Sequence, residues 1–302
     1  MIEDSDPSEL RASLRQSWEC AAAGWGQRAE TMREMGMPVS SWMIERLGLV
    51  PGQRVLELAA GPGDTGFLAA PLVAVPGEAP VAPPGEPGGA ARPGTVICSD
   101  GAEAMLEVAR ARAQELGIEN VEFRRLELEW IDLPAAAVDA ILCRWGVMLV
   151  LDPETCLREC RRVLAPGGRI SLAVWDEAAE NPWATIPGSA LVELGHAQAP
   201  AAGGPGMFAL AAGRRLKELL GATGFTGVEV DRVPVARRFA DADLYVEQTL
   251  DLSPSFSDAW SRLSEAAREE VRARLRELAR PFTGADRALH VPGRALVACA
   301  NA

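Results

Sequence analysis

Short apolar runs alternate along the chain with longer segments in which apolar residues recur every three to four positions. The apolar runs predict seven strands, at residues 54–59, 95–99, 121–126, 138–143, 168–175, 226–235 and 294–300. The periodic segments predict helices at residues 64–73, 101–116, 153–164, 212–222 and 257–280. Strands that alternate with helices form a mostly parallel sheet with helices on both faces. We therefore expect an α/β fold with a Rossmann-like, seven-stranded sheet.

Three segments lie outside this alternation. Residues 8–47 carry a helical pattern interrupted at Gly36-Met37-Pro38, so residues 1–50 are predicted to form a helical cap before a main domain at 51–302. Residues 76–94 hold six prolines and five glycines, which predicts a mobile surface loop. Residues 176–211, after the fifth predicted strand, are rich in proline and glycine and predict an irregular lid insertion over the carboxyl edge of the sheet.

The composition of the chain limits which partners, location and metal sites we expect. The 302 residues carry a formal net charge of −12, which repels a polyanion, so we expect no nucleic-acid substrate. No apolar run reaches the length of a membrane span and the N-terminus lacks a signal pattern, so we expect a cytoplasmic protein. Cys156 and Cys160 share a predicted helix face but have no third ligand nearby, so we expect no metal site. The oligomeric state is open, and a homodimer is one option.

The first predicted strand runs into a glycine-rich turn. The spacing of Gly61, Gly63 and Gly66 fits a dinucleotide-binding turn. However, Glu57 lies in the strand and Asp64 at the start of the next helix, where a pyrophosphate needs amide donors and no neighbouring negative charge. A ligand that carries an ammonium and a sulfonium tolerates both carboxylates, and S-adenosylmethionine is such a ligand.

Three further motifs follow in order. T-V-I-C-S-D at 95–100 forms the second strand, L-E-L-E-W-I-D-L-P at 126–134 follows the third, and V-D-A-I-L-C-R-W-G-V-M at 138–148 spans the fourth. Together with E-L-A-A-G-P-G at 57–63, this order resembles the class I S-adenosylmethionine-dependent methyltransferases, particularly the branch similar to ubiquinone/menaquinone-biosynthesis methyltransferases. The resemblance runs from about residue 15 to the C-terminus. It implies S-adenosyl-L-methionine as cofactor and a small molecule as methyl acceptor.

The resemblance also implies roles for the first two motifs. Glu57 would reach toward the methionine ammonium, and Asp100 would accept hydrogen bonds from both ribose hydroxyls. Gly61 and Gly63 would let the backbone come within contact distance of the cofactor. Ala59 stands where the family usually has its first glycine, an exchange that costs little if φ is negative there.

The remaining motifs would surround the adenine and the methyl group. Met105 would lie against the adenine. Glu127 stands at the usual aspartate position for the adenine amino group, and Leu128 stands where an alanine precedes the amide that faces the ring. The Cys143 carbonyl would suit the cofactor ammonium, and Arg144 would border cofactor and acceptor.

The acceptor side is expected to be apolar. The lid at 176–211 would bind the acceptor, and four aromatic residues are expected to line that site: Trp25, Trp145, Trp183 and Phe208. They suit an apolar or aromatic small molecule such as a phenol, quinol or secondary metabolite, with O- or C-methylation favoured. A general base is needed only for a protonated, weakly acidic acceptor. The three candidates for it are His196, His290 and Tyr245, and none is assigned.

The sequence thus predicts a methyltransferase that acts by direct in-line displacement at the sulfonium-bound carbon. Two alternatives stay open. One is a nicotinamide-dependent oxidoreductase, which rests on the glycine spacing alone. The other is a catalytically silent regulatory protein that binds the cofactor, which the absence of an obvious base permits.

Overall fold

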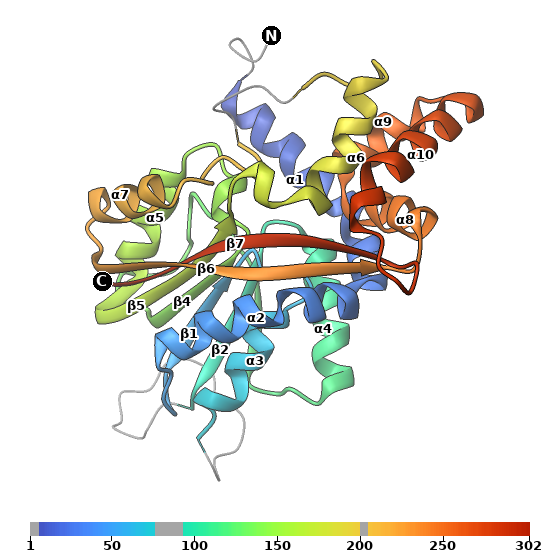
Figure 1. Ribbon diagram of the computed structural model, residues 1–302. Coiled ribbons are helices and arrows are strands. Elements are labelled where there is room, and N and C mark those ends of the chain that lie inside the picture. The colour runs from blue at the N-terminus through green and yellow to red at the C-terminus, as the bar shows by residue number, and fades with distance from the viewer. Residues whose placement is uncertain (1–5, 76–92, 200–204) are drawn as a thin grey trace.

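A computed structural model describes residues 6–75, 93–199 and 205–302 of the chain (Figure 1). Most of the loop predicted at 76–94 and part of the segment at 176–211 lie outside the described residues. No described helix is long and apolar enough to cross a membrane.

The centre of the molecule is a seven-stranded sheet, as the alternating pattern predicted. Its spatial order is β3-β2-β1-β4-β5-β7-β6. The strands are β1 Arg54–Leu58, β2 Thr95–Asp100, β3 Val121–Arg125, β4 Val138–Arg144, β5 Leu164–Trp175, β6 Thr226–Phe239 and β7 Leu289–Asn301. β7 pairs antiparallel with both β5 and β6, and the other pairs are parallel. The Rossmann-like, mostly parallel sheet is therefore confirmed.

Burial explains why the inner strands read as continuous apolar runs. In β1, Leu56 pairs with Ile97 of β2 on one side and with Ile141 of β4 on the other. All three side chains are fully buried. Helices cover both faces of a parallel sheet, so its central strands have no polar face.

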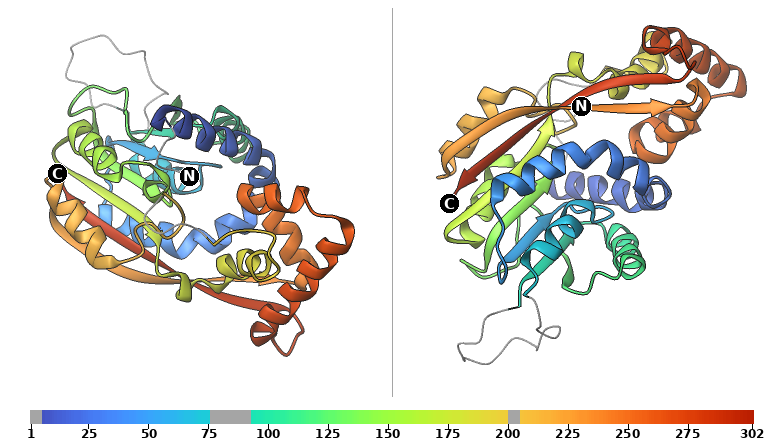
Figure 2. Two further views of the ribbon diagram at one scale, coloured as in Figure 1. Left: turned by 90° about the horizontal axis from the view of Figure 1, so that it is seen from above. Right: turned by 60° about the horizontal axis from the view of Figure 1, so that its bottom comes forward.

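The helices pack on both faces of this sheet, with α2 and α3 on one side and α5 and α7 on the other (Figures 1 and 2). Their bounds are α1 Pro7–Gln27, α2 Ala29–Leu47, α3 Asp64–Val73, α4 Glu103–Leu116, α5 Pro153–Val163, α6 Pro182–Glu193, α7 Gly213–Ala222, α8 Ala242–Leu252, α9 Pro254–Ser261 and α10 Glu265–Ala279. Helix α6 lies in the first half of the segment predicted as a lid, residues 176–211.

Two helix boundaries differ from the sequence prediction. The N-terminal helices separate at Arg28 and not at Gly36-Met37-Pro38, and Pro38 lies inside α2. Helix α2 continues through the proline because it buries one apolar stripe, including Met35, Val39 and Met43, in the core. The single helix predicted at 257–280 is two helices, because the Ser264 hydroxyl accepts from the Ala267 amide and starts α10 anew.

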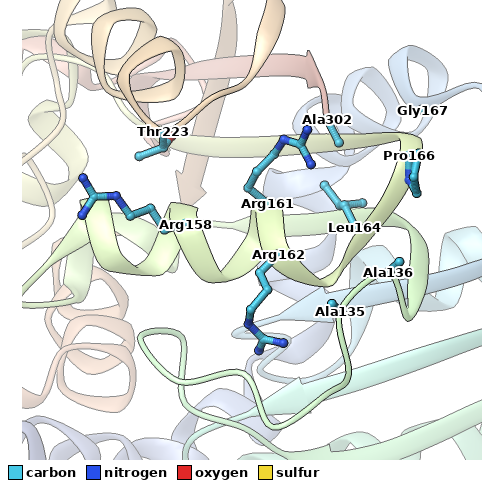
Figure 3. A pocket seen from close by; sticks show the side chains of 10 residues that line it. All are labelled: Ala135, Ala136, Arg158, Arg161, Arg162, Leu164, Pro166, Gly167, Thr223 and Ala302. Atoms are coloured by element: carbon cyan, nitrogen blue, oxygen red, sulfur yellow. The ribbon is translucent and has the colours of Figure 1, made fainter.

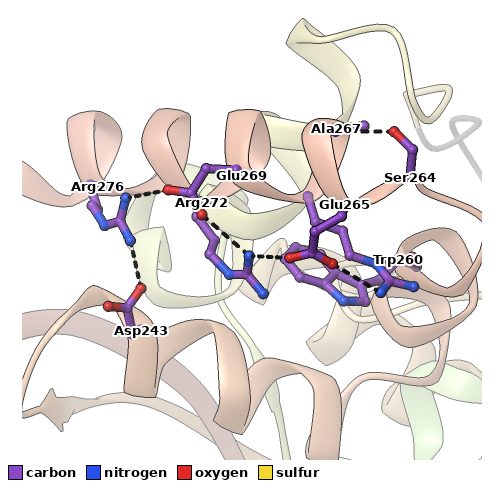
Figure 4. A network of polar contacts seen from close by, with 9 residues as sticks. Asp243, Trp260, Ser264, Glu265, Ala267, Glu269, Arg272 and Arg276 are labelled. Carbon is purple, nitrogen blue, oxygen red and sulfur yellow. Dashed lines mark hydrogen bonds and ion pairs between the residues drawn. The ribbon is translucent and has the colours of Figure 1, made fainter.

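Helices α8 and α10 lie beyond the far ends of β6 and β7, and one ion pair, Arg276–Asp243, joins them (Figure 4). Arg276 contacts Asp243 of α8 at 2.8 Å and Glu269 of its own helix at 3.0 Å. Arg272 adds pairs to Glu265 and Glu269. Because these pairs are exposed to solvent, each contributes little to stability.

Candidate active site

The carboxyl ends of β1, β2 and β4 meet at a cavity of about 170 Å³. Ten of the residues that were predicted to bind the cofactor or the acceptor line it together: Trp25, Glu57, Ala59, Gly61, Asp100, Met105, Glu127, Leu128, Arg144 and Trp145. Gly63 and Cys143 do not line it, although each adjoins a residue that does. The sheet therefore brings together positions that lie up to about 120 residues apart in sequence.

The glycine turn after β1 has the backbone that its sequence requires. Gly61 has φ +53° and Gly63 has φ +86°. A Cβ at Gly63 would stand 2.4 Å from the Phe67 ring, whereas at Gly61 it would meet only open space. The Asp100 carboxylate fixes the turn, because Oδ2 accepts from the Gly61 amide at 3.0 Å and Oδ1 from the Ala102 amide at 2.9 Å. Each of its oxygens retains acceptor capacity for a ligand.

Ala59 does not have the negative φ under which its exchange for glycine would cost little. Its φ is +49°, in the left-handed region. A side chain in this conformation costs about 1–2 kcal/mol relative to glycine. The Ala59 methyl is accommodated by Gly146 at the end of β4, where a Cβ would approach it to 2.6 Å.

Glu57 is a buried carboxyl with an unused hydrogen-bonding position. The side chain is 2% exposed, and within the described residues its Oε2 has no hydrogen-bond partner. Gly66, in the first turn of α3, permits this packing, since a Cβ there would lie 2.3 Å from Oε2. Burial raises the pKa of Glu57 to about 8, so the carboxyl is largely protonated at neutral pH.

An ion-pair cluster lies beside Glu57. The buried Asp64 carboxylate contacts Arg112 at 2.8 Å and Arg144 at 3.1 Å. Arg144 also packs against α2, where a Cβ on Gly36 would come within 1.6 Å of its Nη1. Gly36 is therefore a packing site and not the helix break that its sequence context suggested. The sequence analysis did not predict that Gly36 or Arg112 contributes to the site. The only indication for Gly36 was a glycine within a helical pattern.

Known proteins show sequence similarity to part of the chain. Residues 87–172 match the family described as a methyltransferase domain. Over 128 residues the chain is 32% identical to the ubiquinone/menaquinone biosynthesis C-methyltransferase UbiE of Cellvibrio japonicus, and over an alignment of the same length it is 33% identical to that of Ectopseudomonas mendocina. These alignments cover 42% of this chain and 45% and 43% of the relatives, so they span less than half the length of either.

The chain therefore contains a segment, residues 87–172, that is similar to a methyltransferase domain. Its fold agrees with solved structures of low sequence identity. The YcgJ protein of Bacillus subtilis has a TM-score of 0.54 at 18% identity, with 87% of this chain and 97% of that chain covered. A putative methyltransferase from Bacillus halodurans has a TM-score of 0.53 at 18% identity, with the same two shares covered. At this identity the two structures indicate the fold alone.

Helix α1 closes one side of the cavity of about 170 Å³. Arg11 bonds Glu129 through two nitrogen–oxygen contacts of 2.9 Å, and Arg15 contacts Glu127, the predicted adenine residue, at 2.9 Å. The Glu19 carboxylate accepts from the first two amides of α4 at 2.9 Å each. This contact also places a negative charge at the positive end of that helix. The sequence of α1 did not predict these contacts, because the two residues of each contact are 84 to 118 positions apart in the chain.

A row of tryptophans extends from the cavity toward α6. Trp145, with φ +62°, stacks on Trp175 at 4.2 Å between ring centroids. Trp175 in turn meets the edge of Trp183 at 4.9 Å. Trp183 therefore reaches this cavity only through other rings, and Phe208 does not line it either. On the opposite wall, Trp25 donates to the Leu252 carbonyl at 3.1 Å and joins α1 to α8.

The three candidate bases lie outside the cavity lining. His196 follows α6, and its Nε2 is buried without a partner among the described residues. His290 is exposed on β7 beside Asp286, at 3.2 Å. Tyr245 is fully buried on α8, stacks on Phe239 and donates to the Trp183 carbonyl. Burial raises the pKa of Tyr245 well above its usual range, which keeps the phenol protonated.

A larger open cavity, of about 530 Å³, lies at the amino ends of β4 and β5 (Figure 3). Arg158, Arg161 and Arg162 line it together with Ala302. None of the residues predicted from sequence lies there. Because ligands of open α/β sheets bind at the carboxyl ends of the strands, the smaller cavity is the better candidate for the active site.

Proposed function

We propose that this chain is an S-adenosylmethionine-dependent methyltransferase that methylates an apolar or aromatic small molecule, on oxygen or carbon, by direct in-line displacement. One observation carries the proposal. A buried carboxyl from β1 (Glu57), the glycine turn at Gly61 and a carboxylate from β2 (Asp100) converge on one cavity with aromatic walls. The similar UbiE proteins are named C-methyltransferases, which supports carbon as one of the two target atoms.

The chemistry of the cavity residues fits the cofactor. An ammonium would supply the donor that Glu57 Oε2 lacks. The Asp100 oxygens hold two backbone amides and have capacity for two ribose hydroxyls. The open space at Gly61 allows close approach of a ligand to the backbone. Met105 and Leu128 offer apolar surface for a base.

The size of the cavity adds one requirement. Its volume of about 170 Å³ is below the roughly 300 Å³ at which cofactor sites usually begin. Helix α1 forms one wall through Leu14, Arg15 and Trp18. We therefore propose that α1 moves outward when the cofactor enters.

When bound, S-adenosylmethionine supplies an electrophilic methyl group on a sulfonium. The residues of the chain would supply position and exclude water, which accounts for most of the rate in such displacements. Glu57 would bind the cofactor ammonium and Asp100 would bind its ribose hydroxyls. Trp25 and Trp145 form walls between which an apolar acceptor would fit. No step is assigned to a general base.

The test is calorimetric titration of the purified chain with S-adenosylmethionine, S-adenosylhomocysteine and NADH in parallel. We expect micromolar binding of the first two and none of NADH. Binding of NADH alone would instead favour the oxidoreductase, and no binding of any of the three would refute the proposal.

The second step is a panel of phenols and quinols, with S-adenosylhomocysteine formation as the readout. Cofactor binding without turnover of any acceptor would favour the silent regulatory protein. Turnover would assign the chemistry, and the methylated product would show whether oxygen or carbon is the target.

A further inference from the structure

An arginine of the cavity of about 170 Å³ has a hydrogen-bond donor that no described residue accepts. Arg144, at the end of β4, lines this cavity, and its side chain is 8% exposed. Its Nη2 donates to Asp64 Oδ2 at 3.1 Å, whereas its Nη1 is buried and has no partner among the described residues. Because a buried polar group without a partner is costly, native proteins normally supply one from the chain, from water or from a ligand.

The charge of Arg144 is also incompletely balanced. Asp64 is shared with Arg112, which contacts its other oxygen at 2.8 Å and does not line the cavity. Glu57 adds little negative charge at neutral pH, because burial raises its pKa to about 8. Arg33 of α2, which faces Asp64, is paired within its own helix. Two cations therefore share one carboxylate, and the cluster carries a net positive charge that an anion would neutralise.

Glu57 has the opposite deficiency at the same cavity. Its Oε2 is buried without a donor, just as Arg144 Nη1 is buried without an acceptor. The two side chains come from adjacent parallel strands, β1 and β4, and both line the cavity together with the turn at residues 59–62. No ion pair joins them in the part of the chain that the structure describes. A ligand that carries an ammonium and a carboxylate on one carbon would satisfy both side chains.

Arg144 is held in a fixed position by its other neighbours. Asp64 binds one side of the guanidinium, and the guanidinium carbon lies 4.6 Å from the centroid of the Trp145 ring. On α2, Gly36 leaves the space that Nη1 occupies, since a Cβ there would come within 1.6 Å of this nitrogen. A side chain that is already fixed loses little further rotamer entropy when it binds a ligand.

We propose that Arg144 binds the α-carboxylate of the methionine part of S-adenosylmethionine, while Glu57 binds its α-ammonium. This inference rests on the proposed function, because it assigns a further residue to the same cofactor. The guanidinium has five N–H donors in a planar fork, and Asp64 accepts from one of them, so donors remain for a carboxylate. The carboxylate would supply the acceptor and the negative charge that the described residues do not.

Arg112 offers a matched control. It contacts the same Asp64 carboxylate as Arg144, so Arg112→Gln and Arg144→Gln remove the same charge from one cluster. Only Arg144→Gln changes a residue that lines the cavity. Arg144→Lys keeps the charge and loses the planar fork. The ligands are matched as well, because decarboxylated S-adenosylhomocysteine keeps the ammonium of S-adenosylhomocysteine and lacks only its carboxylate.

The experiment measures binding of both ligands to each protein by calorimetry, with the melting temperature of each variant as a check on folding. We expect the wild type to bind S-adenosylhomocysteine about 10- to 100-fold more tightly than the decarboxylated ligand. Loss of Arg112 affects both ligands alike, so Arg112→Gln keeps this ratio. Arg144→Gln loses the ratio, because only the affinity for the ligand with the carboxylate falls. We expect Arg144→Lys to retain part of the ratio.

Three results would overturn the proposal. The first is a wild type that binds both ligands equally well. The second is an unchanged ratio in whichever of Arg144→Gln and Arg144→Lys folds, which would assign Arg144 a structural role even if both affinities fell together. The third is a loss of the ratio in Arg112→Gln as well, which would assign the effect to the charge of the whole cluster. If neither ligand binds the wild type, the proposed function fails first, and this result is distinct from the other three.

Discussion

Replacement of Glu57 by glutamine isolates the effect of one buried carboxyl on stability. Folding raises the pKa of Glu57 from 4.5 to about 8, mainly through burial. The folded chain therefore holds this proton at pH values where the unfolded chain has released it. Between pH 4.5 and 8 the free energy of unfolding of the wild type should fall with rising pH, and above pH 8 it should level off.

The size of the effect follows from the pKa difference. Each unit corresponds to about 1.4 kcal/mol, so the fall from pH 4.5 amounts to about 3 kcal/mol at pH 7 and about 4 kcal/mol at pH 8. Glutamine has the same shape and does not titrate. The unfolding free energy of Glu57→Gln minus that of the wild type should therefore increase by these amounts between pH 4.5 and 8.

The assay is urea unfolding of both proteins at half-unit steps from pH 4.5 to 9, followed by tryptophan fluorescence. Glu115→Gln is the control, since Glu115 is exposed on α4 and forms no ion pair with the described residues. Its difference from the wild type should stay flat. A flat difference for Glu57→Gln would refute the reasoning, because it would mean that the buried carboxyl has no raised pKa.

Three further variants test neighbouring contacts. Asp100→Ala removes the acceptor of the Gly61 and Ala102 amides, so S-adenosylhomocysteine should bind about 1–3 kcal/mol more weakly by calorimetry; an unchanged dissociation constant would contradict the ribose assignment. Ala59→Gly relieves the left-handed backbone and should raise the unfolding free energy in urea by about 0.5–1 kcal/mol, after the entropy of glycine is subtracted; a loss of stability would show that the alanine is not strained. Glu19→Gln weakens the clamp of α1 on α4, so stopped-flow fluorescence should show faster association of S-adenosylhomocysteine, and an unchanged rate would mean that α1 does not limit entry.

The parts of the site that follow each strand were predictable because their requirements are local. A turn that needs positive φ selects glycine, which marked Gly61 and Gly63. The carboxyl ends of adjacent parallel strands meet at one edge, which placed Glu57 and Asp100 together. Their roles toward the cofactor stay predictions until binding is measured.

The contacts that involve α1, α2 and the region beyond β6 were not predictable, since each depends on packing between distant segments. Gly36 reads locally as a helix break, but Arg144, 108 positions later, occupies the space that its side chain would fill. Ala59 reads as a harmless exchange until its φ of +49° is known. Tyr245 reads as a candidate base, although α8 buries it and its hydroxyl is committed to a backbone carbonyl.

The sequence by itself determined the alternation of strands and helices, the seven-stranded sheet and the edge at which the cofactor motifs meet. These features follow from hydrophobic periodicity and from backbone limits within a few residues. The tertiary structure alone decided that Glu57 keeps its proton and that α1 closes the cavity. Each of these depends on which groups exclude water from which charge, and that is set by contacts across the fold.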